Sequence, residues 1–235
     1  MARWEKVQND GRIGIVPDIK VGMLTPEELA AITEVARQYG EKVHLTAGQR
    51  LIILGVPPER VEEAKEALRA AGFGVGTSGA VVRNVRACPG KEYCKNGLQP
   101  TLDLGMRMHE RFTGWELQRP VKIGVSGCPH SCSESLTRDI GIYGVPSGYK
   151  VFIGGKGGMK PMDGRPLKIV KVERAHELVD VVQKVLDFYT ANAGKRERIG
   201  DLIARIGFEA FQEAVKGSVV MVPATVVGAE ASGEG

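Results

Sequence analysis

Four cysteines, arranged as two pairs in the middle third of the chain, constrain this sequence more than any other feature. Cys88 and Cys94 lie in the segment ACPGKEYC, and Cys128 and Cys132 lie in GCPHSC. They are the only four cysteines among 235 residues. Four thiolates make up the usual complete ligand set of one [4Fe–4S] cluster. The two pairs therefore predict that these residues bind one such cluster together.

The second pair is also predicted to lie on a helix. Cys128 and Cys132 are four positions apart in the sequence, which on a helix places both sulfurs on one face. Pro129 suits the first turn of such a helix, because its missing N–H is no loss there. The free N–H groups and the positive dipole end of this helix would then point at the cluster sulfurs.

Three other uses of the cysteines remain open. A structural zinc site is one, although zinc sites more typically have two residues between paired cysteines. A disulfide framework is the second, although the chain is long enough for a core and the second pair has helical spacing. Four unrelated buried thiols are the third, but proline and glycine beside both pairs indicate purpose-built loops.

The composition is globular, and the segment around the cysteines is basic. Hydrophobic residues make up 43% and charged residues 26% of the chain, as in soluble globular proteins. From Arg83 to Lys171 there are 15 basic and 7 acidic residues, which indicates either a solvated face or an anionic partner. Aromatic residues are only 6% and no recognition-helix or base-stacking motif is present. The sequence therefore favours small anions and a carboxylate-rich cofactor, and no nucleic acid.

We expect a cytoplasmic protein that does not contact membranes. No apolar run reaches the length of a membrane span, and the opening MARWEK does not lead into the apolar core of a signal peptide. In the cytoplasm, thiols stay free to bind metal.

The first 80 residues are predicted to form a ferredoxin-like half-domain. Residues 12–24 suggest one or two strands, and the capping box Thr25–Glu28 begins a helix that ends at Gly40. Residues 43–56 form strand with a bulge or tight bend at Ala47-Gly48, and Pro57-Pro58 opens a second helix. This β-α-β-α order is typical of that half-domain.

The remainder is predicted to be an α/β domain around the cysteines over 81–172, helices packing on it over 173–216, and a flexible tail over 217–235. The fold class is therefore α+β. Within the second domain, a helix is expected over 99–112. Strands are expected over 122–126, 140–143, 149–153 and 167–172. The C-terminal helices are expected over 173–191 and over 196–215, with a break near Gly207.

At the cysteine motifs, the sequence resembles the siroheme-containing sulfite and nitrite reductases. The stretches 42–56, Asp139–Gly141 and 152–158 also match this family. The resemblance covers most of the chain, from residue 12 to residue 215. It is closest to the siroheme part of the NADH-type nitrite reductase large subunit and to low-molecular-weight sulfite reductases. Longer members of the family contain two copies of this unit, whereas no internal repeat is visible here.

The resemblance implies a siroheme-dependent six-electron reductase of sulfite to sulfide, or of nitrite to ammonia. The implied cofactors are a [4Fe–4S] cluster on Cys88, Cys94, Cys128 and Cys132, and siroheme, whose iron would share Cys132 with the cluster. Electrons would enter at the cluster. The protein would supply positioning and positive charge.

The resemblance also implies a basic substrate site on the open face of siroheme. Arg83 and Lys122 match family positions that bind the anionic substrate. Gly48 and Pro120 stand where the family often has a further arginine and a further lysine. Arg50, near Gly48, is a third candidate for contact with the substrate.

Other residues are candidates for proton transfer or for binding siroheme. His130 lies between two cluster ligands and is a candidate proton donor, with a capping or packing role as the alternative. The glycines of the GGKGG stretch would let the backbone approach a ligand, unless they form a flexible hairpin tip. The candidates for cofactor binding are Thr46, Gln49, Arg86, Lys91, Lys95, Gly154, Gly155, Lys156, Lys160 and Arg165.

Three functions stay open: a catalytic siroheme reductase, a [4Fe–4S] electron-transfer or redox-sensing protein without siroheme, and a siroheme-binding subunit of a larger partner. The GGKGG stretch is not a dinucleotide fingerprint. Electrons are therefore expected from a separate ferredoxin or reductase subunit. In the two-copy relatives, the cysteines belong to one copy and the substrate-binding basic residues to the other, whereas this single copy carries both sets. The resemblance therefore implies a homodimer or a higher even assembly with shared sites, and the alternative is a monomer whose own basic residues, such as Arg50 and Lys91, close the pocket.

Overall fold

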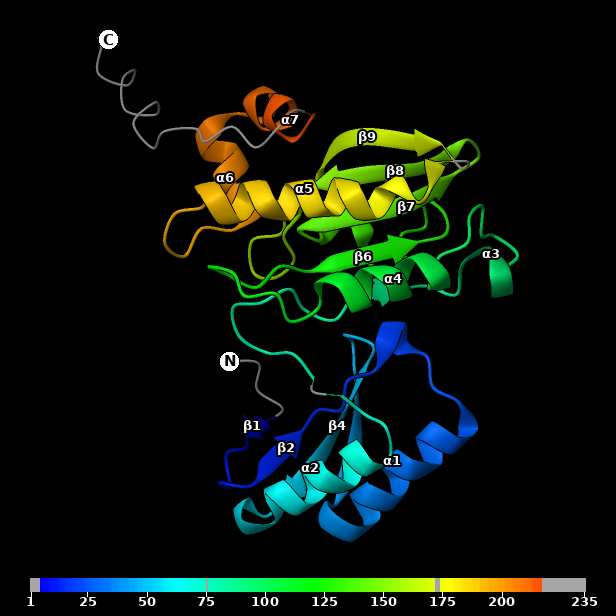
Figure 1. Cartoon of the computed structure of the whole chain (residues 1–235), viewed down its shortest axis with the longest axis vertical. Helices are drawn as coiled ribbons and strands as arrows, with labels where there is room; N and C mark the ends of the chain where they lie inside the picture. Colours follow the sequence, from blue (N-terminus) through cyan, green and yellow to red (C-terminus); the bar gives the residue numbers. More distant parts are fainter. Residues whose placement is uncertain (1–4, 75, 172–173, 217–235) are drawn as a thin grey trace.

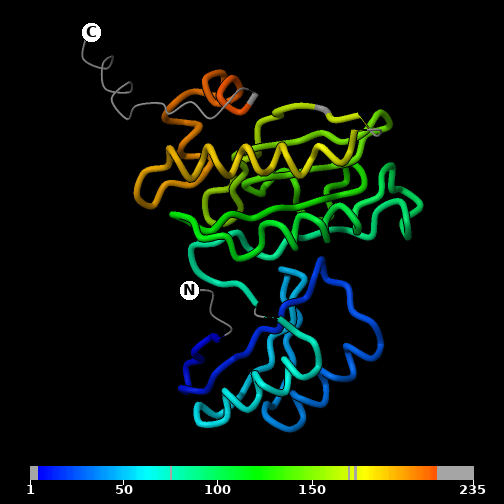
Figure 2. Tube along the Cα trace, viewed as in Figure 1, coloured from blue at the N-terminus to red at the C-terminus, as the bar shows by residue number. Residues whose placement is uncertain are grey.

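The chain forms two units, each built on its own sheet, in a computed structural model that describes residues 5–74, 76–171 and 174–216 (Figure 1). The N-terminal unit is blue to cyan, and the second unit is green to orange. Figure 2 shows the trace leaving the first unit and entering the second. The arrangement of helices and sheets confirms the α+β class. The predicted tail lies outside the described residues.

The N-terminal unit is a four-stranded antiparallel sheet, with strand order β1-β2-β4-β3 and with two helices packed on it. Its elements are β1 (Glu5–Val7), β2 (Ile13–Ile15), η1 (Lys20–Gly22), α1 (Pro26–Tyr39), β3 (Lys42–Thr46), β4 (Arg50–Val56), η2 (Pro58–Arg60) and α2 (Val61–Ala70). The capping box at Thr25 begins α1 as predicted. Its core joins Ile32 of α1 and Leu68 of α2 to Ile15 and Ile53 of the sheet.

The predicted bend at Ala47-Gly48 is the turn of a hairpin. Thr46 of β3 pairs with Arg50 of β4, and the Thr46 hydroxyl accepts hydrogen bonds from the N–H groups of Gly48 and Arg50, each at 3.2 Å. The fourth residue of the turn, Gln49, has a φ of 56°. The hairpin tip therefore has a fixed conformation.

The second unit contains a five-stranded sheet of order β5-β6-β7-β8-β9. The pairs β5–β6 and β6–β7 are parallel, and β7–β8 and β8–β9 are antiparallel. Its elements are β5 (Arg86–Ala87), α3 (Gly90–Tyr93), α4 (Leu102–Phe112), β6 (Ile123–Ser126), η3 (Ser135–Thr137), β7 (Ile140–Val145), β8 (Gly148–Ile153) and β9 (Arg165–Lys171). Each predicted strand is present, with small shifts in its ends.

Three C-terminal helices complete the core of the second unit: α5 (Glu177–Asn192), α6 (Ile199–Ile206) and α7 (Phe208–Lys216). The predicted break falls at Gly207, which has a φ of +87°. Phe188 of α5 and Phe211 of α7 are fully buried and meet edge to face, with ring centroids 5.4 Å apart. The helices thus belong to the same hydrophobic core as the sheet.

Side-chain hydrogen bonds join the two units. The Gln49 amide donates to the carbonyl of Ala87 at 2.6 Å and accepts from the N–H of Ala87 at 3.0 Å. Asp18 accepts a hydrogen bond from Asn84 at 2.9 Å and contacts His109 at 3.0 Å. The first unit is therefore bonded to the segment that leads into the cysteines.

The helix predicted at Cys128–Cys132 is wrong. These residues form turns, in which Ser131 donates to the carbonyl of Cys128 and has a φ of 54°. That left-handed conformation does not occur within a right-handed helix. The dipole argument for the second pair therefore does not hold.

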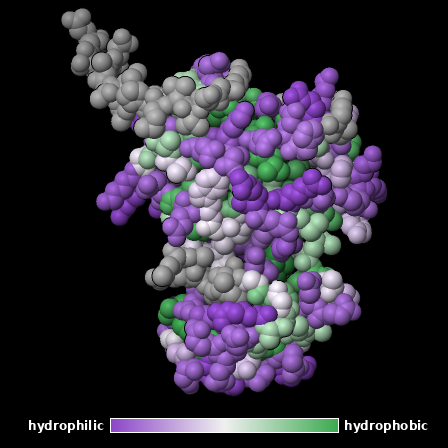
Figure 3. Space-filling model, in the orientation of Figure 1, coloured by the Kyte–Doolittle hydropathy of each residue, from purple (hydrophilic) through white to green (hydrophobic). Residues whose placement is uncertain are grey.

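None of the helices in the described part of the chain is long and apolar enough to cross a membrane. The face seen in Figure 3 is mostly hydrophilic, and its hydrophobic residues lie in small separate patches.

Candidate functional site

Two neighbouring parallel strands bring the cysteine pairs together. β5 ends at Ala87, directly before Cys88, and β6 ends at Ser126, two residues before Cys128. In the register of the two strands, Ala87 lies opposite Val125. Because parallel strands end at the same edge of a sheet, both cysteine loops begin there. Cys88 and Cys128 are buried, whereas Cys94 and Cys132 are exposed.

The two cysteine loops are packed against each other through glycine. A Cβ atom on Gly127 would lie 2.8 Å from the Cα atom of Gly90, so the contact needs glycine. The Gly127 carbonyl accepts hydrogen bonds from the N–H groups of Leu98 and Gln99, at 2.8 and 3.0 Å. The loop that follows Cys94 is thereby held against the residue that precedes Cys128.

The sulfurs of the buried cysteines have polar neighbours. The N–H of Gly127 donates to Cys88 Sγ at 3.1 Å, and Cys128 Sγ lies 3.3 Å from Nδ1 of His130. N–H donors stabilise a thiolate and tune the potential of a cluster bound to it. None of the four cysteines forms a disulfide. The buried end of the site is thus suited to thiolate ligands.

A different arrangement would be needed for a single metal ion. In the ranges that the structure describes, no three His, Cys, Asp or Glu side chains are grouped so that they could hold one ion. A [4Fe–4S] cluster does not need such a group, because each of its four thiolates binds a different iron atom.

The loop that carries Cys132 lies on two glycines of the sheet. Gly124 of β6 and Gly141 of β7 are partners in the parallel pair. A Cβ atom on Gly141 would lie 1.7 Å from the Ser135 carbonyl oxygen. The Ser133 and Ser135 hydroxyls donate to strand carbonyls, each at 2.8 Å. The chain from Cys132 to η3 is therefore fixed against the sheet.

A cleft of about 410 Å³ lies between the hairpin of the first unit and the strands of the second. We call it the basic cleft, because it is lined by Thr46, Ala47, Gly48, Arg50, Arg83, Asn84, Arg86, Lys122, Ile123 and Arg138. It unites five of the residues chosen from the sequence: Thr46, Arg50, Arg83, Arg86 and Lys122.

The cations of the basic cleft are held partly out of water. Burial lowers the pKa of Arg50, Arg83, Lys122 and Arg138 below their ordinary values. For Arg50, Lys122 and Arg138, the repulsion of nearby cations lowers the pKa further. Like charges that are gathered and desolvated in this way favour the binding of an anion.

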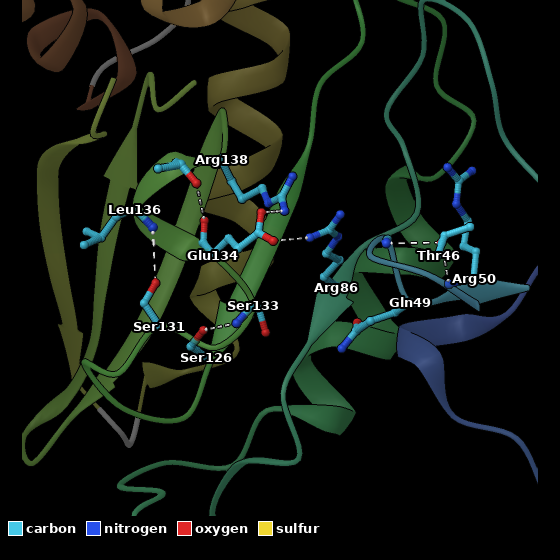
Figure 4. Close-up of polar contacts among 12 residues, drawn as sticks. Thr46, Gln49, Arg50, Arg86, Ser126, Ser131, Ser133, Glu134, Leu136 and Arg138 are labelled. Carbon is cyan, nitrogen blue, oxygen red and sulfur yellow. Dashed lines mark hydrogen bonds and ion pairs between the residues drawn. The ribbon is translucent and has the colours of Figure 1, made fainter. Parts of the chain in front are cut away.

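Glu134 connects the cysteine loop to the basic cleft. Figure 4 shows its side chain between Arg138 on one side and Arg86 on the other. Its carboxylate forms an ion pair with Arg86 at 3.1 Å and a second one with Arg138. Arg138 is 4% exposed, and its Nε is buried without a hydrogen-bond partner. The guanidinium of Arg138 is therefore held almost wholly out of water, with Glu134 as its counter-ion.

Other residues chosen from the sequence lie outside the lining of the basic cleft. The side chain of Gln49 is bonded to Ala87. Lys91, Lys95 and His130 are exposed on the two cysteine loops. The remaining five, Gly154, Gly155, Lys156, Lys160 and Arg165, do not line it either.

The glycine loop is occupied by contacts within the protein. A Cβ atom on Gly155 would lie 2.4 Å from the carbonyl oxygens of Leu136 and Arg138, so this glycine approaches backbone. Gly154 donates its N–H to Asp139. Lys156 lies 3.8 Å from Asp201, Lys160 is exposed, and Arg165 lies over the ring of Phe208 at 4.2 Å. The loop thus supports the segment that contains Arg138.

Arg138 and Glu134 were not selected from the sequence. Both belong to the basic segment around the cysteines, and Arg138 directly precedes Asp139–Gly141, one of the stretches that carry the resemblance. Its position directly before that stretch is the signal for Arg138. No sequence signal marks Glu134, because its contact with Arg86 depends on a left-handed backbone at φ 57°.

Comparison with known proteins gives matches to both units. Residues 78–220 match the family model of the nitrite and sulphite reductase 4Fe-4S domain, and residues 6–71 match that of the nitrite/sulfite reductase ferredoxin-like half domain. An assimilatory-type sulfite reductase of Nitratidesulfovibrio vulgaris is 37% identical over 86% of this chain and 92% of its own length.

Longer proteins match over part of their length. A nitrite reductase [NAD(P)H] of Bacillus subtilis is 30% identical over 89% of this chain, which spans only 26% of that enzyme. The crystal structure of dissimilatory sulfite reductase I superposes with a TM-score of 0.78 at 15% identity, over 94% of this chain and 72% of the other. At that identity, the superposition supports the fold alone.

Proposed function

Because this chain belongs to the nitrite and sulphite reductase family, we propose that it reduces a small oxyanion, sulfite in the first place, by six electrons. The observation that carries this proposal is the basic cleft beside the cysteine loops, linked to them by Glu134. The relative from Nitratidesulfovibrio, nearly all of whose length is matched, is named as a sulfite reductase. Nitrite is the alternative substrate.

Membership in the family implies a [4Fe–4S] cluster and siroheme. The residues suit both groups. Four free cysteines, two of them buried with an N–H donor beside Cys88, form a thiolate set for the cluster. The five cations that line the basic cleft suit the carboxylates of siroheme. When bound, the two groups supply the electron store and the iron at which the oxyanion is reduced.

The basic side chains would orient the substrate and balance its charge. Arg83 donates to the carbonyls of Gly79 and Thr77, at 3.1 and 3.5 Å, which directs its guanidinium toward the cleft. Lys122 has a pKa lowered by burial and by Arg138, so it gives up a proton more readily than an exposed lysine. We assign anion binding to Arg83 and Arg50, and both anion binding and proton delivery to Lys122. His130, beside Cys128, is a second proton donor in this proposal.

Electrons would come from a separate protein, a ferredoxin or a reductase subunit. The exposed cysteines Cys94 and Cys132 support an accessible cluster. Free thiols suit a reducing compartment such as the cytoplasm. We further propose a homodimer, or a higher even assembly, in which one chain's Arg83 and Lys122 complete its partner's site. The alternative is a monomer whose own basic residues close the pocket, and the gathering of Arg50, Arg83 and Lys122 in one chain's cleft supports that alternative.

One purification tests the catalytic proposal. The chain is co-expressed with siroheme synthesis, purified without oxygen and examined by visible spectroscopy. We expect siroheme bands that sulfite perturbs, and sulfide production with reduced methyl viologen as the donor. An iron–sulfur spectrum without siroheme would overturn the proposal in favour of an electron-transfer protein.

Subunit mixing tests the assembly. A Cys132→Ser chain, which should be inactive, and an Arg83→Ala chain, whose activity should be low, should together regain part of the activity when they exchange subunits. A monomer in light scattering, or no regained activity after exchange, would rule out shared sites.

A further inference from the structure

Glu134 is an acidic side chain that is bonded to two arginines of the basic cleft. Among the described residues that line the cleft, five are cations and none is a carboxylate. Glu134 forms ion pairs with both Arg86 and Arg138 (Figure 4), and it follows Cys132 by two residues in the chain. Asp139, also near, is engaged by Arg198 at 2.8 and 3.0 Å.

The backbone at Glu134 is held in a conformation that glutamate seldom adopts. Its φ and ψ are 57° and 37°, the left-handed region, which costs energy for a residue with a Cβ atom. Contacts of its neighbours maintain this conformation, because Ser133 and Ser135 are bonded to the strands on both sides. The loop thus delivers a carboxylate to the two arginines.

The Glu134 carboxylate is bonded to both arginines, but these two ion pairs can break. Its side chain is 52% exposed, whereas those of Arg86 and Arg138 are 17% and 4% exposed. A half-exposed carboxylate is rehydrated easily when its ion pairs break. The buried Arg138, by contrast, would be costly to leave without an anion. Replacement of Glu134 by another anion is therefore favoured over its simple loss.

We propose that Glu134 is an internal counter-anion, which keeps the Arg86–Arg138 position closed to small anions until a ligand with several carboxylates displaces it. Sulfate or sulfite must bind from free solution, and so competes poorly with a carboxylate that is tethered beside the two arginines. A ligand with several carboxylates contacts Arg86 and Arg138 together with other cleft cations. Its free energy of binding therefore exceeds that of the two Glu134 ion pairs that it replaces. Small anions are thereby directed to the Arg83–Lys122 part of the cleft, away from Glu134.

This proposal rests on the proposed function in one respect, because the carboxylate-rich ligand would be siroheme. Its test does not depend on catalysis. The full chain is produced without siroheme, and sulfate binding is measured by calorimetry for the wild type and for Glu134→Gln. Glu66→Gln is the matched control, since Glu66 also pairs with an arginine, Arg69, but on the exposed face of α2.

We expect Glu134→Gln to bind sulfate about tenfold more tightly than the wild type, the scale of one charge-assisted contact. Glu66→Gln should bind sulfate as the wild type does. Benzenehexacarboxylate serves as the carboxylate-rich probe. The ratio of the affinity for benzenehexacarboxylate to the affinity for sulfate should be clearly larger in the wild type than in Glu134→Gln. Equal sulfate affinity in the wild type and Glu134→Gln would overturn the proposal.

Thermal melting gives a second, independent measurement. Glu134→Gln should melt below the wild type in dilute chloride buffer and regain most of that difference when sulfate is added. Glu134→Asn removes the same charge, and asparagine tolerates the left-handed backbone better than glutamate does. This variant should melt, and respond to sulfate, as Glu134→Gln does. If both variants lose their fold and sulfate does not restore it, Glu134 has a purely structural role and the proposal fails. Reductase activity may be absent without affecting either outcome, which separates this test from that of the proposed function.

Discussion

Asp139 and Arg198 form a bidentate ion pair that joins the C-terminal helices to the strand edge beside the basic cleft. Arg198 donates to the two carboxylate oxygens at 3.0 and 2.8 Å, and the side chain of Asp139 is 0% exposed. The same carboxylate accepts the backbone N–H of Lys122 at 2.9 Å. The position of Lys122 thus depends on a residue near the start of α6.

Removing Arg198 should destabilise the protein strongly. Arg198→Leu leaves the carboxylate of Asp139 buried without its partner, which typically costs about 3–5 kcal/mol. Urea denaturation followed by circular dichroism measures the change. Arg37→Leu is the control, since Arg37 forms an exposed pair with Glu34, and its loss should cost less than about 1 kcal/mol. A similar small effect for both variants would show that the Asp139 pair is not important for stability.

Cys94→Ser should remove the iron–sulfur cluster. Cys94 is exposed and unpaired, so serine is tolerated sterically, while its hydroxyl is a poor ligand for iron. Iron and acid-labile sulfide are measured after purification without oxygen. Asn96→Ala, in the same exposed loop, should retain both. A full complement of iron in Cys94→Ser would contradict the assignment of this ligand.

Arg83→Ala should weaken substrate binding while siroheme remains bound. We expect KM for sulfite to rise, or turnover to fall, by at least about tenfold, since a charge-assisted hydrogen bond contributes about 1.5–3 kcal/mol. The siroheme absorbance serves as the measure of cofactor content. Arg107→Ala, on the exposed side of α4, is the control. Unchanged kinetics in Arg83→Ala would place the substrate elsewhere.

Lys122 should make anion binding sensitive to alkaline pH. Burial, with Arg138 and Arg198 nearby, lowers the pKa of Lys122, and a lysine is charged only below its pKa. Raising the pH through this lowered pKa therefore neutralises Lys122 and weakens anion binding. Lys122→Arg stays charged and should shift the rise in KM to higher pH, whereas Lys42→Arg, exposed on β3, should not. Identical pH profiles for the wild type and Lys122→Arg would refute this role.

The convergence of the cysteine pairs could be predicted because it depends on strands. Periodic apolar residues predict β6 before Cys128, and the parallel register with β5 then brings Cys88 to the same edge. The hairpin at Ala47-Gly48 and the break at Gly207 were likewise predictable, since glycine marks each turn. These features depend on local sequence or on sheet geometry.

The rest of the candidate site depends on unusual backbone conformations and on long-range contacts. Gln49 has the chemistry of a cofactor ligand in the sequence, yet at φ 56° its amide bonds the backbone of Ala87. The spacing of Cys128 and Cys132 suggests a helix, but Ser131 turns the chain at φ 54°. Glu134 reaches Arg86 from a third such residue. The periodic patterns that predict helices and strands do not show where a residue other than glycine will adopt the left-handed backbone conformation.

Val21, in η1 of the first unit, lies in the hydrophobic core of the second unit with Ala87 and Leu102. A duplication or gene fusion that copied only one unit would expose this side chain, or leave a gap where it packs. The segment that can be inherited and recombined as a working module is therefore the two units together, even though each has a sheet of its own.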